Sequence, residues 1–247
     1  MFKDSITASV VFVSITLMFS SCNGHNDPDP NPTNGRTSAI FNSEITYGTM
    51  TDREGNVYRT VTIGTQTWMA ENLRTKTYDD GTPIPLVTDD TEWSALTDGA
   101  YCIYNNTEDI DTLATYGCLY NWYAVSTGKL APEGWHVPTE DEWKTLELYL
   151  AGAETAGGKL KETSSMHWTG PNAGATNETG FTALPGGFRI FDGSFYYMGT
   201  HGYWWSISQV YHDPDFVWSR RILEPYSALI SYNGQILEGM SVRCVKD

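Results

Sequence analysis

The chain has 247 residues, of which 40% are hydrophobic and 13% aromatic. This content excludes a disordered protein and is enough for one large folded domain. The 15 Lys and Arg residues face 30 Asp and Glu, a formal net charge of −15, so binding to the phosphates of DNA or RNA is disfavoured. Only 18% of residues are charged, whereas Gly (23), Tyr (15) and Trp (9) are abundant, which indicates short strands and loops and excludes a helical bundle.

Residues 1–21 have the layout of a secretory signal peptide. Lys3 precedes an apolar run over residues 6–19, which is shorter than the about 20 helical residues that span a bilayer. Two serines then precede Cys22, as in a bacterial lipobox, although the last apolar residue is Phe instead of the commonest Leu. We therefore expect cleavage before Cys22 and acylation of its thiol. An ordinary signal peptide with an incidental Cys is the alternative.

Residues 22–38 are typical of a flexible tether, because they carry prolines at alternate positions and no apolar periodicity. Asp27 and Asp29 weakly resemble the acidic signals that send lipoproteins of Gram-negative bacteria to the outer face of the outer membrane. We expect an outer-membrane lipoprotein, on the cell surface or the periplasmic face, that meets the membrane through the lipid on Cys22.

Three cysteines lie in the rest of the chain. Because an exported chain meets an oxidising compartment, we expect a disulfide between Cys102 and Cys118. Cys244, flanked by valines in an apolar segment, should stay free and buried. The sequence has no Cys-x-x-Cys pair and no Cys and His set at zinc spacing. We therefore expect no metal site and no cofactor.

The folded part, residues 39–247, has no internal repeat and is predicted to be one domain. A run of β-branched and aromatic residues predicts a strand over residues 57–63, and a Gly-Thr turn returns the chain over residues 66–72. Residues 79–92 carry prolines, acidic residues and a glycine, and are predicted to form a loop.

The clearest helix signal begins at Thr139. Its side chain can cap the first turn while Glu142 reaches back to its amide, and the neighbouring acidic residues favour the positive end of the helix dipole. Trp143, Leu146 and Leu150 recur at three- and four-residue spacing, which predicts one buried face. A glycine two residues later should end this helix.

Two other regions are less regular. Residues 119–125 fit a buried strand or a helix equally well. Beyond residue 157, short apolar runs separated by turn residues predict irregular β structure that ends in a strand over residues 240–245.

Several sequence blocks together resemble the Fibrobacter succinogenes major paralogous domain. In chain order they read VTIGTQTWMAENL, DDGTPIP, LYNWYAV, GWHVPTEDEW, GATNETGFTALPGGFR, GYWWSIS and SVRCVKD, and the resemblance covers residues 48–247. That family is similar to the formylglycine-generating-enzyme and sulfatase-modifying group, which has a C-type-lectin-like fold. The resemblance implies an α+β fold with two helices, near residues 119–126 and from Thr139, packed on a twisted antiparallel sheet with extensive irregular loops.

The resemblance does not extend to the residues that formylglycine-generating enzymes use for catalysis. An oxidase of the formylglycine-generating type needs a pair of reactive cysteines near its C-terminal end, where this chain has only Cys244, and its five histidines show no ligand spacing. His136, just before the capped helix, is interpreted as structural. We expect a protein that is not an enzyme. A metal- or thiol-dependent enzyme of that group is the alternative.

Known sugar-binding patterns are also incomplete. C-type lectins bind calcium and sugar through Glu-Pro-Asn and Trp-Asn-Asp, whereas this chain has Glu-Pro-Tyr at 224–226 and no Trp-Asn-Asp. The acidic residues Asp79, Asp80, Asp89 and Asp90 fit a solvated loop better than a calcium site. The aromatic run at 203–205 is interpreted as core instead of a stacking platform for sugars.

Residues 208–240 match the family least. They mix Tyr, Ser, Asn, Arg and Asp with single apolar residues, which is typical of adaptable binding loops, and in lectin-like domains the equivalent stretch forms the exposed binding face. We expect a binding module, adhesin-like or receptor-like, for an extracellular protein or glycan; a ligandless structural surface component is the alternative. The candidate ligand-binding residues are Tyr211, His212, Glu224, Tyr226, Asn233 and Gln235.

Overall fold

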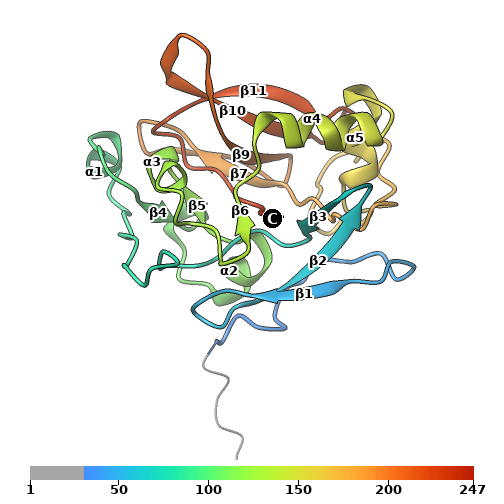
Figure 1. Ribbon diagram of the computed structural model, residues 1–247, viewed down its shortest axis with the longest axis horizontal. Helices are drawn as coiled ribbons and strands as arrows, with labels where there is room; N and C mark the ends of the chain where they lie inside the picture. Colours follow the sequence, from blue (N-terminus) through green and yellow to red (C-terminus); the bar gives the residue numbers. More distant parts are fainter. Residues whose placement is uncertain (1–30) are drawn as a thin grey trace, which may run out of the picture.

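The computed structural model describes residues 31–247. The predicted signal peptide, the lipidation site at Cys22 and the first part of the tether lie outside these residues. Within them, two five-stranded sheets and a two-stranded ladder are combined with five α-helices (Figure 1). The expected α+β class is therefore confirmed, with more helices than the two that the resemblance implies.

The first sheet brings the two ends of the domain together. Its strands stand in the order β1-β2-β3-β12-β6. The predicted hairpin is confirmed as β2 and β3, although β3 ends at Met69. The chain's last strand is shorter than expected, and Val245 in it pairs with Trp68 and His136. The strands are β1 (Gly48–Thr51), β2 (Val57–Ile63), β3 (Gln66–Met69), β6 (Trp135–His136) and β12 (Val245–Lys246).

The second sheet contains the C-terminal part that was expected to be irregular. Its strands stand in the order β11-β10-β9-β7-β8, and all pairs are antiparallel except β7 with β9. The β9–β10 hairpin projects beyond the rest of the molecule, at the top of Figure 1. The strands are β7 (Gly186–Arg189), β8 (Phe195–Met198), β9 (His201–Val210), β10 (Asp213–Leu223) and β11 (Ile230–Gln235).

The helices follow local capping signals. The capping box at Thr139 is present at the start of α4. Residues 119–125, for which the sequence allows a strand or a helix, contain both. Strand β5 (Leu119–Tyr120) is followed directly by helix α3 (Trp122–Ser126), whose N-cap is Asn121. The remaining elements are α1 (Asp90–Ser94), β4 (Tyr101–Cys102), the 3-10 helix η1 (Tyr104–Asn106), α2 (Ile110–Tyr116), β5 (Leu119–Tyr120), α3 (Trp122–Ser126), α4 (Glu140–Tyr149) and α5 (Ala153–Leu160).

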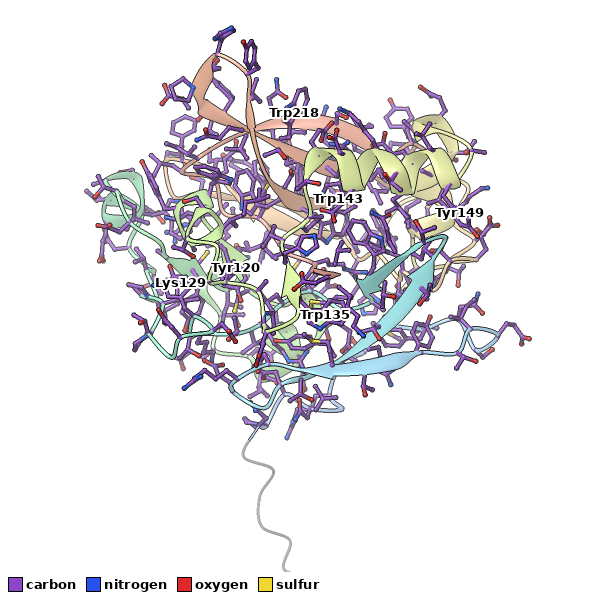
Figure 2. The ribbon with its side chains drawn as sticks, viewed as in Figure 1. Tyr120, Lys129, Trp135, Trp143, Tyr149 and Trp218 are labelled. Carbon is purple, nitrogen blue, oxygen red and sulfur yellow. The ribbon has the colours of Figure 1, made fainter. Side chains whose placement is uncertain are left out.

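Aromatic rings fill the core between α4 and the two sheets. Trp143 is fully buried, and its ring centroid lies 4.7 Å from that of Trp68. Trp204 and Trp205 are also buried, and their indole N–H groups donate to Asn72 and to the Tyr120 carbonyl. The core interpretation of the 203–205 run is thus confirmed. Figure 2 shows Trp143 beneath α4.

The expected disulfide between Cys102 and Cys118 is not formed, and both residues are free, buried thiols. Cys102 pairs across the ladder with Leu119, so the preceding Cys118 points to the opposite face. The two side chains accordingly belong to different core clusters. Burial raises the pKa of each thiol to about 12. Cys244 is free and buried, as expected.

Residues 31–38, which the sequence assigns to the tether, are attached to the folded body. The buried Thr33 side chain accepts a hydrogen bond of 2.9 Å from Arg74 Nε. Asn34 donates to the Gly55 carbonyl and accepts from the Val57 amide. Residues 31–38 are therefore part of the folded body and not of a flexible spacer, and the rest of the predicted tether lies outside the described residues.

Candidate functional site

The tip of the β9–β10 hairpin is the most exposed feature of the C-terminal sheet. Val210 pairs with Asp213, which leaves a turn of Tyr211 and His212. Tyr211 is 84% exposed, its ring lies 3.7 Å from that of His212, and His212 has a φ of 65°. A positive φ at this turn position usually selects Gly or Asn. The tip thus holds two aromatic side chains in solvent on a turn of unusual sequence.

The six candidate ligand-binding residues do not form one site. Glu224 and Tyr226 follow the far end of β10, and eleven residues of strand separate them from the tip, or about 35 Å at the usual strand rise. Asn233 and Gln235 lie within β11, opposite Trp218 and Phe216. The stretch expected to be binding loops is therefore mostly strand, and a small ligand that contacts the tip cannot also contact Tyr226.

A shallow cavity of about 290 Å³ lies along the hairpin. Asp215 and Phe216 on β10 form one wall, and Gln235, Ile236 and Leu237 at the end of β11 form the other. Gln235 is the one candidate residue in this lining. The register of β9 on β10 shifts between Asp213 and Ser219, and such bulges increase the twist of a hairpin. The bulged hairpin and the cavity together make a contact surface with apolar and polar groups.

A second cavity, of about 490 Å³, lies at the opposite end of β10. Tyr226 and Pro225 line it together with Glu154 of α5. Lys161 is buried beneath this connection, and its ammonium group donates to the carbonyls of Glu224 and Tyr226 at 3.3 and 3.0 Å. Burial lowers the pKa of Lys161 to about 8. These bonds fix the backbone of the β10–β11 connection.

A third surface, which we call the aromatic face, runs across one side of the second sheet, from β8 and β7 over β9 to β11. Tyr197 stacks on His201 with a ring distance of 4.3 Å, and Phe188 stacks on Tyr203 at 4.4 Å. Tyr196 and Tyr197 remain 43% and 49% exposed. Sequence reasoning missed this surface. Its members are Phe188, Tyr196, Tyr197, His201, Tyr203 and Tyr232.

Charged groups border the aromatic face. The Arg221 guanidinium lies 5.0 Å from the Tyr232 ring centroid, a cation–π geometry. Burial, reinforced by the charge of Arg221, lowers the pKa of His201. The Tyr232 hydroxyl donates to the buried Glu238 carboxyl at 3.1 Å. Burial raises the pKa of Glu238 to about 7.

A buried ion-pair network holds α4 on the back of this sheet. Arg220 is fully buried and donates to both carboxylate oxygens of Glu140, at 2.6 and 3.0 Å. Its Nε donates to Glu147 at 2.6 Å. Because β10 carries both Arg220 and the hairpin, this network fixes the orientation of the hairpin relative to the body.

Ser38, His167 and Glu162 have the connectivity of a hydrolase triad. Ser38 Oγ lies 2.9 Å from His167 Nε2, and His167 Nδ1 lies 2.8 Å from Glu162 Oε2. However, the Ser38 amide already donates to Thr115 Oγ1 and the Ile40 amide donates to Glu162. An oxyanion hole needs donors aimed at the reacting carbonyl, whereas these two amides attach the segment that contains Ser38 and Ile40 to the rest of the fold. We therefore interpret this set of hydrogen bonds as an anchor for that segment.

His136 and the acidic loop also make structural contacts. His136 lies 2.7 Å from Asp247 Oδ1 and 2.6 Å from Glu142 Oε1. Burial lowers its pKa, but the hydrogen bonds and charges of the two carboxylates outweigh burial, so the net shift in its pKa is upward. Asp80 pairs with Lys129 and Asp89 caps α1. Across residues 31–247, no three His, Cys, Asp or Glu side chains gather as ligands for a metal ion.

Comparison with known protein families identifies the family of the chain. The family model described as Fibrobacter succinogenes major domain matches residues 61–246, from β2 to β12. No curated protein and no solved structure matches the chain. None of the helices described between residues 31 and 247 has the length and apolar character needed to cross a bilayer.

Proposed function

The chain belongs to the Fibrobacter succinogenes major domain family, and we propose that it is a lipid-anchored binding module of the cell envelope or cell surface. The β9–β10 hairpin and its adjacent cavity contact an extracellular ligand, a protein or a glycan. The observation that carries this proposal is the projecting turn, where Tyr211 is 84% exposed and His212 has a positive φ. Tyr gives a large contact area at a low cost in conformational entropy.

The finer fold assignment belongs to the same proposal. We assign the α+β fold to the C-type-lectin-like class, on the strength of the sequence blocks that resemble the formylglycine-generating group. The catalytic alternative depends on Cys244. That thiol is fully buried, and burial raises its pKa well above the usual range, whereas a reactive cysteine needs an accessible thiolate. The burial of Cys244 therefore argues against the thiol-dependent form of this alternative.

The anchor is tested separately from the ligand. Cys22→Ser should abolish fatty-acid labelling and move the full chain from the membrane fraction to the soluble fraction. Retention in the membrane after this change would mean that residues 6–19 are an uncleaved anchor.

The ligand surface is tested with the full chain on arrays of extracellular glycans and proteins. The double variant Tyr211→Ala, His212→Ala should weaken binding to the captured ligand at least about tenfold. Tyr226→Ala is the matched control, since Tyr226 is also exposed but lies at the other end of β10. An array without any bound ligand, or equal loss in both variants, would contradict the proposal.

A further inference from the structure

The aromatic face depends on a strained residue. Tyr197 has a φ of 67°, a left-handed conformation that is unfavourable for a bulky side chain. Successive side chains of a strand normally point to opposite faces, yet the rings of Tyr196 and Tyr197 lie only 5.8 Å apart. The strained backbone thus brings two exposed tyrosines together. Strain of this kind is characteristic of binding and catalytic sites.

The rings behind Tyr197 hold it in a fixed orientation. Its ring is within 5° of parallel to Phe188 and within 21° of parallel to His201. Phe188 and Tyr203 are themselves buried. The exposed ring face is therefore preorganised, so that a ligand that packs on it loses little side-chain entropy on the protein side.

The aromatic face also carries an unneutralised cation. Within residues 31–247 no ion pair joins Arg221 to a carboxylate, although the chain has a net charge of −15. The buried Nε of Arg221 has no hydrogen-bond partner. Arg221 on β10 lies directly opposite Tyr203 on β9 in the strand register. This position places the positive charge beside the stacked rings. A guanidinium binds a carboxylate through two parallel hydrogen bonds.

We propose that the aromatic face binds an acidic sugar: a pyranose ring packs on Tyr196 and Tyr197, and the carboxylate of the sugar pairs with Arg221. The weakly positive C–H groups of a pyranose suit the negative face of a tyrosine ring. A carboxylate also neutralises the charge that this chain leaves unpaired. This inference rests on the proposed binding function and names the ligand class of a second surface, apart from the hairpin.

The test measures equilibrium binding of the full chain to two acidic probes, oligogalacturonate and sialyllactose, which separate uronic from sialic acids. The fully methyl-esterified oligogalacturonate is the neutral control. We expect tight binding of at least one acid. Tyr197→Ala and Arg221→Gln should each weaken it at least about tenfold, and Arg221→Gln should remove the preference for oligogalacturonate over its ester. Tyr149→Ala, at an exposed tyrosine of α4, should have no effect.

Circular dichroism confirms that each variant is folded before binding is measured. No binding of either acid would overturn the inference, and so would equal binding of the acid and its ester, or unchanged binding by the Tyr197 variant. The hairpin variant Tyr211→Ala, His212→Ala keeps the two proposals apart. If a ligand from the arrays still depends on the hairpin while both acids fail to bind, the binding function stands and the acidic-sugar site is wrong.

Discussion

Glu238 gives the sharpest prediction about stability, because its carboxyl is buried without a cation. The Tyr232 hydroxyl and the Gln235 amide each donate to it at 3.1 Å. Burial outweighs these bonds and raises the pKa from 4.5 to about 7. Between these values the folded state holds a proton that the unfolded state has lost, so stability falls as the pH rises.

The magnitude follows from the two pKa values. Each pKa unit corresponds to about 1.4 kcal/mol, so above about pH 7 the ionised carboxyl costs the folded state about 3 kcal/mol. Glu238→Gln cannot ionise, but it loses one acceptor and therefore about 1 kcal/mol of hydrogen bonding. The variant should be about 1 kcal/mol less stable than the wild type near pH 4 and about 2 kcal/mol more stable near pH 8.

Urea unfolding of both proteins across this pH range measures the difference directly. The difference in the free energy of unfolding between the two proteins cancels the contributions of the other acidic residues, because both chains share them. Glu108→Gln, at an exposed glutamate, serves as the control for the Glu-to-Gln exchange itself. A Glu238→Gln difference that is constant from pH 4 to pH 8 would refute the reasoning.

Three further changes test how α4 is built and docked, each by urea unfolding. Thr139→Ala removes the capping acceptor and should cost about 1 kcal/mol; a change near zero would mean that the cap is dispensable. Trp143→Ala should cost about 3–5 kcal/mol through the cavity it leaves, and a loss below about 1 kcal/mol would contradict its full burial. Arg220→Met leaves the buried Glu140 with only the exposed Lys144 as a partner, at 3.6 Å, and leaves the partly buried Glu147 without a cation; it should cost about 3 kcal/mol, the lower end of the range for breaking a buried ion pair, most of which should return when both glutamates are also changed to Gln.

Local signals were enough to predict several elements. The capping box and the spacing of Trp143, Leu146 and Leu150 predict α4, and the Gly-Thr turn predicts the β2–β3 hairpin. These signals work because capping and tight turns depend on residues only a few positions apart. The glycine that ends α4 illustrates the limit. Gly152 has a φ of 102° and is also the N-cap of α5, so the same glycine that predicts the end of α4 precedes a second helix that the sequence pattern does not predict.

The surfaces proposed for binding depend on contacts that no local pattern encodes. The turn of Tyr211 and His212 lacks the Gly or Asn that marks a two-residue hairpin, so the sequence predicts loops where the structure has β9 and β10. The aromatic face requires the parallel pairing of β7 with β9 and the positive φ of Tyr197. Cys102 and Cys118 are near in sequence, but strand alternation turns them apart. Each of these features depends on register between strands, which residue composition does not determine.

The central claim is that the β9–β10 hairpin and its cavity contact the ligand. Amide hydrogen exchange of the full chain, with and without the tightest-binding array ligand, tests this most directly. The ligand should slow exchange at residues 210–216 and 235–237 and leave exchange at residues 224–228 unchanged. Slower exchange confined to residues 224–228, or to the β2–β3 hairpin, would contradict it.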